Sequence, residues 1–327
     1  VQSFVLDKIP TWDEKVQAVA SNYLITRGSE EGSFSLYDFA RSGDYAPMVE
    51  ANLLSAALVH LPFYYTVTRN AVNQRIRSRA GQSDDPYAKW AYWDALSRSP
   101  ENISYLTGLW KKTQDLIQKS GLTSAYVNAY GYIDQDHINA KSRSDYRTEL
   151  TKTLIEAIIS TDAGAVAIAS AGLEGQFEKI KNDLPDVATL KEVLNKLKLP
   201  EQLESYNALE ALIAKIEGRP SKPIESENVR PIQWEWIDRL QPTSRAVIKT
   251  SAGDMEIRFL SEMSPHSVSN FLDLSNRGFY SNKFFHRVVP NFVIQTGCPR
   301  GDGYGSLDYN IRSEFGPHHY HDTGKVG

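Results

Sequence analysis

Apolar side chains recur at steps of three and four residues through the first two thirds of the chain, which predicts a succession of short α-helices. The first expected helix starts at a capping box formed by Thr11 and Glu14 and stops at Gly28. Its apolar positions are Trp12, Val16, Val19, Ala20 and Tyr23. Further helices are expected at residues 48–61, 87–96, 103–117, 146–159, 162–173, 190–197 and 206–216. Helix-breaking residues should separate them, at Gly43, Pro62, Gly81, Pro100, Gly121, Gly172, Pro185, Pro200 and Gly218.

Two architectures fit such a row of helices in residues 1–217: an irregular α-helical bundle, or a solenoid of helix pairs in which each pair packs only on its neighbours. The segment 161–173, TDAGAVAIASAGL, favours the solenoid because its small residues allow helices to approach closely, and it resembles the second helix of a HEAT repeat. Aromatic residues at helical spacing are expected to pack in the core rather than form a ligand site; these are Trp90, Trp93, Trp110, Tyr126 and Tyr130.

The pattern changes after residue 217. Residues 218–244 begin with a proline-rich, weakly apolar stretch, which predicts an extended linker. Trp234 and Trp236 are expected to dock this linker on a neighbouring domain. From Arg245 the apolar period becomes two. Strands are expected at residues 246–250 and 255–259 as a hairpin, and again at 283–289 and 292–296, with a helix between the two pairs from residue 265 or 266 to Asn276.

Composition excludes several classes of protein. The chain of 327 residues is 41% hydrophobic and 23% charged, which is typical of globular domains and unlike a disordered protein. A net charge of −4 argues against a nucleic-acid partner, and no apolar run is long enough to span a membrane. The single cysteine, Cys298, rules out an intramolecular disulfide. Because the chain starts at Val1 without a methionine, we expect that residues precede it in the native protein.

The run from Phe285 to Gly297, FHRVVPNFVIQTG, resembles the signature of cyclophilin-type peptidyl-prolyl isomerases. Residues 250–254 resemble the first hairpin of that family. Its first helix is matched by Pro265, Val268, Asn270, Phe271 and Leu272, the helix exit by residues 278–280, and the loop after the active strand by residues 301–305.

The resemblance implies an antiparallel β-barrel, of which residues 245–327 supply the first half. Residues 322–327 look like the approach to the next core strand, so we expect the cyclophilin-like domain to be truncated here. The expected fold class is therefore multidomain α and β: a HEAT-like solenoid or bundle followed by a partial cyclophilin-like barrel.

The resemblance also implies the site. Arg287 falls on the family's catalytic arginine, which hydrogen-bonds near the substrate proline, and Phe292 on the aromatic residue that packs on the proline ring. Gln295 matches the residue that binds the substrate backbone, and Val293 replaces a frequent methionine in the substrate-binding wall. His286 is part of the signature and points to the opposite face from Arg287, as a supporting substrate contact. These roles require no cofactor and no metal.

Other conspicuous residues have plainer explanations. His318, His319 and His321 are expected in a solvated loop, since no carboxylate framework accompanies them, and Cys298 is expected to be a packed thiol. Gly301, Gly303 and Gly305 fit a backbone turn rather than a phosphate loop, because no Lys-Ser/Thr pair follows them.

The implied function is isomerisation of X-Pro bonds in proline-containing polypeptide clients, with the helical region binding a client or a protein partner. The domain combination looks like a bacterial folding factor of the cell envelope or periplasm, although the cytoplasm stays open. The main alternative is a protein-binding scaffold with a silent cyclophilin part. A third is an enzyme of the helical region, such as an α/α-barrel lyase.

Overall fold

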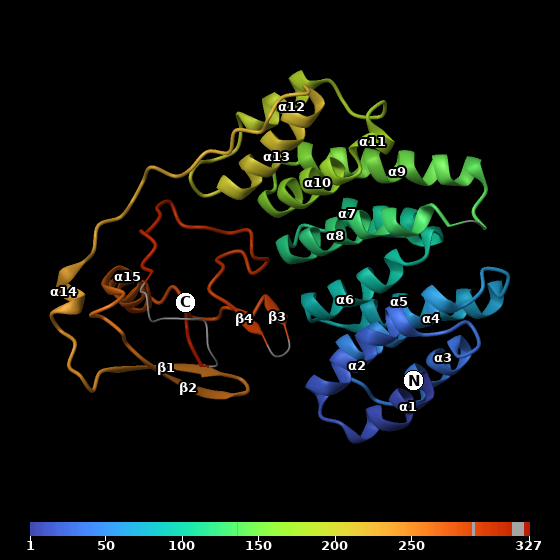
Figure 1. Cartoon of the computed structure of the whole chain (residues 1–327), viewed down its shortest axis with the longest axis horizontal. Helices are drawn as coiled ribbons and strands as arrows, with labels where there is room; N and C mark the ends of the chain where they lie inside the picture. Colours follow the sequence, from blue (N-terminus) through green and yellow to red (C-terminus); the bar gives the residue numbers. More distant parts are fainter. Residues whose placement is uncertain (136, 290–291, 316–323) are drawn as a thin grey trace.

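The structure is a computed structural model that describes residues 1–135, 137–289, 292–315 and 324–327 (Figure 1). His318, His319, His321, Asp322 and Thr323, on which expectations were stated, lie outside the described residues. A region rich in helices is followed by a small region with strands, which confirms the expected order of the two fold types. The helices before the linker are α1 Gln2–Lys8, α2 Glu14–Arg27, α3 Ser33–Ser42, α4 Pro47–His60, α5 Thr66–Gln82, α6 Pro86–Ser97, α7 Ile103–Lys112, α8 Leu116–Ile133, α9 Ala140–Ile159, α10 Ala163–Gly175, α11 Phe177–Ile180, α12 Val187–Leu194 and α13 Leu203–Ile216, with 3₁₀ turns η1 Ile9–Thr11 and η2 Pro100–Asn102.

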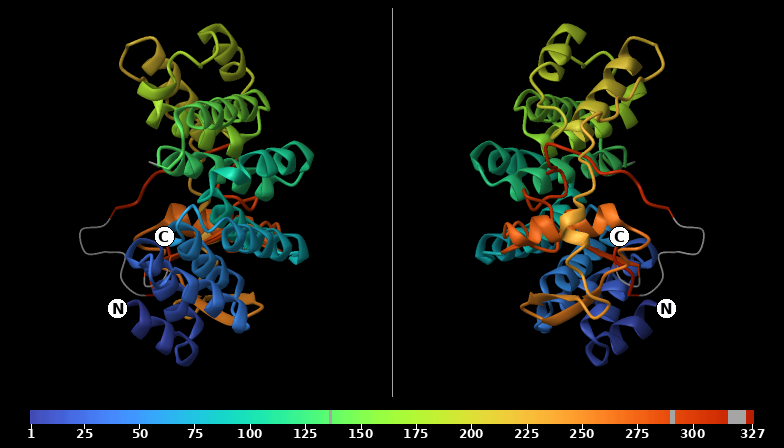
Figure 2. Two further views of the ribbon diagram at one scale, coloured as in Figure 1. Left: turned by 90° about the vertical axis from the view of Figure 1, so that its right-hand side faces the viewer. Right: turned by 90° about the vertical axis from the view of Figure 1, so that its left-hand side faces the viewer.

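The helical region is a stack of helix pairs. Helices α2, α4, α6, α8, α10 and α13 form one row in which each packs on the next, while α3, α5, α7, α9 and α12 flank that row. The two side views in Figure 2 show the stack rising from the blue N-terminal helices to the yellow-green ones. A continuous cluster of buried side chains runs through it from Val5 to Ile213. This order of packing is that of a solenoid, and the HEAT identity of its repeats stays a prediction.

The start of α2 differs from the prediction. Its N-cap is Asp13, whose carboxylate accepts from the Val16 backbone N–H at 3.1 Å, while the Thr11 hydroxyl donates to the Lys8 carbonyl at 2.7 Å. The buried face is also different, because Leu24 and Ile25 are buried whereas Val16, Val19 and Tyr23 are 41%, 46% and 45% exposed. The predicted capping box is therefore wrong, because a better-placed acceptor lies two residues further on.

The predicted helix at residues 103–117 ends at Lys112, and α8, from Leu116 to Ile133, was not predicted beyond its first two residues. The chain breaks between α7 and α8, where Asp115 caps α8 by accepting from the Gln118 backbone N–H at 2.8 Å. Gly81, Gly121 and Gly172, expected as breakers, lie inside α5, α8 and α10.

Close helix approach explains why two of these glycines lie in helices. A Cβ on Gly172 of α10 would lie 2.4 Å from Cγ2 of Val127 on α8, and a Cβ on Gly121 would lie 2.8 Å from the ring of Trp90 on α6. The expectation that small residues bring these helices together is confirmed. Four of the five aromatic residues expected in the core are buried, since Trp93, Trp110, Tyr126 and Tyr130 are at most 7% exposed, whereas Trp90 is only partly buried.

The C-terminal region contains α14 Trp234–Ile237, β1 Arg245–Thr250, β2 Gly253–Arg258, α15 Pro265–Asn276, β3 Arg287–Val289 and β4 Val293–Gln295. Strands β1 and β2 form the expected antiparallel hairpin, with Thr250 opposite Gly253, and α15 has the expected bounds. Strands β3 and β4 form a second antiparallel pair, shorter than predicted. Within the described residues the strands make two separate two-stranded sheets and no closed barrel.

The segment between the two regions is extended but attached at both ends. Asn207 on α13 exchanges two hydrogen bonds with the backbone of Ile224, at 3.0 and 2.9 Å. Further on, the Arg230 N–H donates to the Asn310 carbonyl at 2.9 Å and its guanidinium pairs with Asp273 of α15 at 2.8 Å. Helix α14 packs on α15, with Trp236 partly buried, but Trp234 is 55% exposed, so the docking role expected of that side chain is not confirmed. Across the described ranges, no helix is long and apolar enough to cross a membrane.

Candidate active site

The β3–β4 hairpin brings two of the predicted site residues together. Arg287 and Gln295 stand directly opposite each other in the antiparallel register, and Arg287 Nη1 donates to Gln295 Oε1 at 3.1 Å. Both side chains are exposed. This contact fixes one edge of the guanidinium, and its remaining N–H groups have no partner among the described residues, so they can donate to a substrate.

The other predicted site residues flank this pair. Phe292 precedes β4 and is 78% exposed, and Val293 at the start of β4 is half-buried. His286, just before β3, is half-buried, and its Nδ1 is buried without a hydrogen-bond partner among the described residues. Burial lowers the pKa of His286, and the Arg287 charge acts in the same direction against the attraction of Asp302. The ring is therefore neutral at pH 7.

The loop after β4 packs against the His286 ring. Gly301 and Gly303 have φ values of +80° and +89°, which a residue with a side chain rarely adopts. A Cβ on Gly303 would lie 3.3 Å from Cδ2 of the His286 ring. These glycines form a backbone turn, as the sequence predicted.

The same loop is bound to the helical region by buried polar groups. The Asp302 side chain is fully buried and accepts from the Ser120 hydroxyl of α8 at 2.9 Å and from the Arg300 guanidinium at 2.8 Å. Arg300 also contacts both carboxylate oxygens of Asp162, the N-cap of α10, at 3.0 and 2.9 Å. Cys298 is buried beside Asp302, which confirms the packed thiol.

Tyr87 at the start of α6 makes the second connection. Its hydroxyl donates to the Gly301 carbonyl at 2.5 Å, and its ring packs edge-on against Phe284 with 5.6 Å between centroids. Burial raises the pKa of Tyr87 to about 12, so the hydroxyl is a stable donor at neutral pH. In Figure 1 β3 lies beside α6.

Sequence reasoning missed Tyr87, Ser120, Asp162, Arg300 and Asp302. Their contacts join positions up to 214 residues apart, so no local spacing relates them. The only local signal was Asp162 ahead of a helical segment, and that marks a helix start in any protein.

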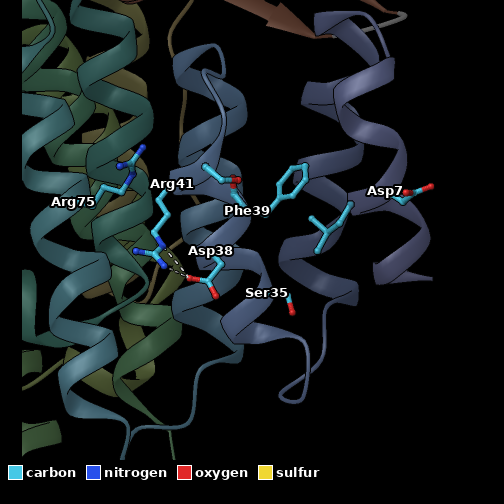
Figure 3. A pocket seen from close by; sticks show the side chains of 8 residues that line it. Asp7, Ser35, Asp38, Phe39, Arg41 and Arg75 are labelled. Carbon is cyan, nitrogen blue, oxygen red and sulfur yellow. Dashed lines mark hydrogen bonds and ion pairs between the residues drawn. The ribbon is translucent and has the colours of Figure 1, made fainter.

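A separate cavity of about 850 Å³ lies on the helical region, away from the hairpin (Figures 1 and 3). Its charged groups are already paired: Arg41 contacts Asp38 at 2.9 Å, and Arg75 contacts Glu50. The residues labelled in Figure 3 are Asp7, Ser35, Asp38, Phe39, Arg41 and Arg75. Among the residues with described positions, no cluster of three His, Cys, Asp or Glu side chains could hold a metal ion.

Comparison with known proteins finds a family match over the segment that contains the β3–β4 hairpin. Residues 245–327 match the family model described as cyclophilin type peptidyl-prolyl cis-trans isomerase/CLD. A peptidyl-prolyl cis-trans isomerase of Helicobacter pylori strain J99 is 37% identical over 93 residues, covering 28% of this chain and 54% of that protein. Peptidyl-prolyl cis-trans isomerase B of Bacillus subtilis is 45% identical over 73 residues, covering 22% of this chain and 51% of the relative.

The chain thus spans about half the length of these relatives. No solved structure matches the chain. The matched segment contains both strands that carry Arg287 and Gln295, and the helical region lies outside it. Residues 245–327 are thus similar to part of a cyclophilin-type peptidyl-prolyl cis-trans isomerase.

Proposed function

We propose that this protein catalyses cis–trans isomerisation of X-Pro bonds in polypeptides, with Arg287, Phe292 and Gln295 as catalytic residues and His286 and Val293 as substrate contacts. The observation that carries the proposal is the Arg287–Gln295 pair, held at 3.1 Å across a hairpin within the family segment. Phe292, immediately before β4 in the same hairpin, is 78% exposed and offers an apolar surface for a proline ring.

The isomerisation reaction requires few catalytic groups. Rotation about an amide faces a barrier of about 18–20 kcal/mol because resonance gives the C–N bond double-bond character. At the twisted transition state the nitrogen lone pair is released from resonance and can accept a hydrogen bond. Arg287 is always protonated and presents several donors, so one edge can bind Gln295 while another meets that lone pair. This bond forms only in the transition state and therefore accelerates the reaction.

Substrate binding is assigned to the neighbouring side chains. Phe292 and Val293 would contact the proline ring, and the exposed Gln295 amide would bind the substrate backbone while orienting Arg287. A neutral His286 adds no charge beside the guanidinium. The Val293 side chain is shorter than a methionine, so it leaves more room and larger residues next to the proline should be accommodated.

The helical region is proposed to bind clients or a protein partner. An exposed aromatic cluster on it supports this role: Phe63, Tyr64 and Tyr65 are 50%, 59% and 41% exposed, and the Phe34 ring packs edge-on against Tyr65. Aromatic surfaces of this kind suit proline-rich segments.

The test is a prolyl-peptide isomerisation assay with Arg287→Ala. Removing one donor aimed at a developing charge typically lowers kcat by about 10²–10³-fold, and we expect a loss in that range. Arg258→Ala, at the exposed end of β2, is the matched control and should keep its activity. Circular dichroism checks that both variants fold. An unchanged isomerisation rate in Arg287→Ala would contradict the proposed mechanism.

One observation favours the alternative of a scaffold that binds without catalysing. Phe292 at 78% and Val288 at 60% exposure form an open surface on the hairpin, rather than an enclosed pocket around a proline. A scaffold would bind proline peptides, measured by calorimetry, without accelerating their isomerisation. The same assay therefore separates the two functions.

A further inference from the structure

We propose that Tyr87 of the helical region is a positioning residue for the isomerase site, holding both ends of the β3–β4 hairpin so that the Arg287–Gln295 geometry depends on helix α6. The inference rests on the proposed function and adds to it a role for the helical region in catalysis. Tyr87 acts through the hairpin and is not itself assigned a contact with substrate.

A single side chain reaches both ends of the hairpin. The Tyr87 ring contacts Phe284, which precedes β3, and its hydroxyl donates to the carbonyl of Gly301, which follows β4. The two ends are also tied to each other, because the Thr296 hydroxyl donates to the Phe284 carbonyl at 2.7 Å. The open ends of the strands are thus fixed against α6.

Buried charges fix the same loop in a second place. Arg300 lies between the carboxylates of Asp162 and Asp302, whose side chains are 8% and 0% exposed. The carboxylate of Asp162 is itself held at the N-terminus of α10, where it accepts from the Ala165 backbone N–H at 3.0 Å. Because a buried carboxylate that loses its partners is costly, the loop cannot slide on the helices without a large penalty.

The loop and helix surfaces are also matched in shape. A Cβ on Gly301 would lie 3.0 Å from Cδ1 of Ile117, at the start of α8. On the helix side, a Cβ on Gly164 would lie 2.8 Å from Oδ2 of Asp302. Glycine on each surface therefore permits close contact between the loop and α8 and α10.

The consequence for catalysis follows from the register. Arg287 and Gln295 are cross-strand partners, so any splaying of β3 from β4 changes the direction of the guanidinium. Small displacements of a catalytic group lower rates strongly, and a shift of about 1 Å can cost about 100-fold. Holding both strand ends on Tyr87 limits that displacement.

The test uses Tyr87→Phe and Tyr87→Ala in the whole chain. Tyr87→Phe keeps the ring against Phe284 and removes only the bond to Gly301, so we expect kcat to fall by about 3-fold; Tyr87→Ala loses both contacts and should lower it by about 10-fold. KM should stay within about 2-fold, because Phe292 and Val293 remain. Tyr132→Phe is the control, since it removes another tyrosine hydroxyl of the helical region, one that accepts from Arg98 Nη1 at 2.6 Å near the C-terminal end of α8.

Cys298 supplies a readout that needs no activity. It is the chain's one cysteine and is buried in the loop contact, so a thiol reagent reaches it only when the loop detaches. Tyr87→Ala should raise the labelling rate by about 10-fold or more, and Tyr132→Phe should leave it unchanged.

The outcomes separate the inference from the function on which it rests. Faster labelling together with a fall in kcat supports the positioning role. If Arg287→Ala abolishes activity while Tyr87→Ala leaves kcat or the labelling rate unchanged, the positioning role is overturned and the isomerase function stands. If Arg287→Ala changes nothing, the proposed function fails and the catalytic role of Tyr87 fails with it, even where labelling is faster.

Discussion

Glu50 joins three successive helices of the stack, and its removal gives a prediction with a definite magnitude. The carboxylate on α4 is 1% exposed; Arg75 and Arg79 of α5 donate to it, through their Nε atoms at 2.8 and 2.6 Å. The Tyr92 hydroxyl of α6 donates to it at 2.7 Å. Glu50→Ala removes the common acceptor of all three groups.

Breaking a buried ion pair by deleting one partner costs about 3–5 kcal/mol. The arginine side chains left behind are 28% and 36% exposed, so water screens part of that loss and the lower end, about 3 kcal/mol, applies. The helical region ends at Ile216, and an unfolding entropy of about 2.1 cal/mol/K per residue gives it about 0.45 kcal/mol/K. The expected fall in Tm is therefore about 7 °C.

Differential scanning calorimetry measures this shift on the transition of the helical region. Glu31→Ala, at an exposed position, is the control and should move Tm by less than about 1 °C. Glu50→Gln keeps an acceptor without the charge and should fall between the two. A shift below about 2 °C for Glu50→Ala would refute the view that this buried carboxylate stabilises the stack.

Two further predictions concern the same region. Gly172→Ala should destabilise the protein by about 1–3 kcal/mol, because the new Cβ meets Val127 at 2.4 Å, whereas Gly108→Ala in α7, with open space around it, should stabilise by up to about 1 kcal/mol; urea unfolding compares them. The hydrogen bond from Lys179 lowers the pKa of Asp134, so this carboxylate stabilises the fold above its ordinary pKa of about 4, and that contribution disappears as the pH falls through the lowered value. Urea midpoints at pH 7 and pH 3 should therefore differ less in Asp134→Asn than in the parent chain, and equal differences would contradict this.

Periodicity predicted many of the helices but missed α3, most of α8, and α5, in which polar groups are buried. Helix α5 was missed because two of its buried residues are Arg69 and Asn73. The Arg69 guanidinium donates to the carbonyls of Leu58 and Leu61 at 2.8 and 2.9 Å, which satisfies groups at the end of α4. Such a partner is defined only by the packed structure, so a hydropathy pattern does not reveal it.

The glycines show a second limit of prediction from the sequence pattern. Gly121 and Gly172 were predicted to end helices because glycine lowers helix propensity, yet both lie where another helix comes too close for a side chain. Tertiary contact outweighs a propensity cost of about 1 kcal/mol. In the C-terminal region, by contrast, turn and strand signals are local, and the β1–β2 hairpin and α15 were predicted closely.

The signature run identified the hairpin residues but not their setting. Arg287 and Gln295 were expected as site residues, and their assignment to catalysis stays a proposal. The contacts of Arg300 with Asp162, 138 residues away, and of Asp302 with Ser120, 182 residues away, depend on how the helices stack. A single sequence contains no spacing that relates them.

The attachment of the segment between the two regions has a consequence for how strongly the loop must bind α6, α8 and α10. The loop and the helices belong to one chain, and the segment that joins them is held by Asn207 on Ile224 at one end and by Arg230 on Asp273 at the other. A tether of this kind corresponds to an effective concentration of roughly millimolar, so even a contact too weak to form between separate molecules stays largely closed. The fraction of closed loops is then independent of dilution, and it changes only when the contact itself or the tether is altered.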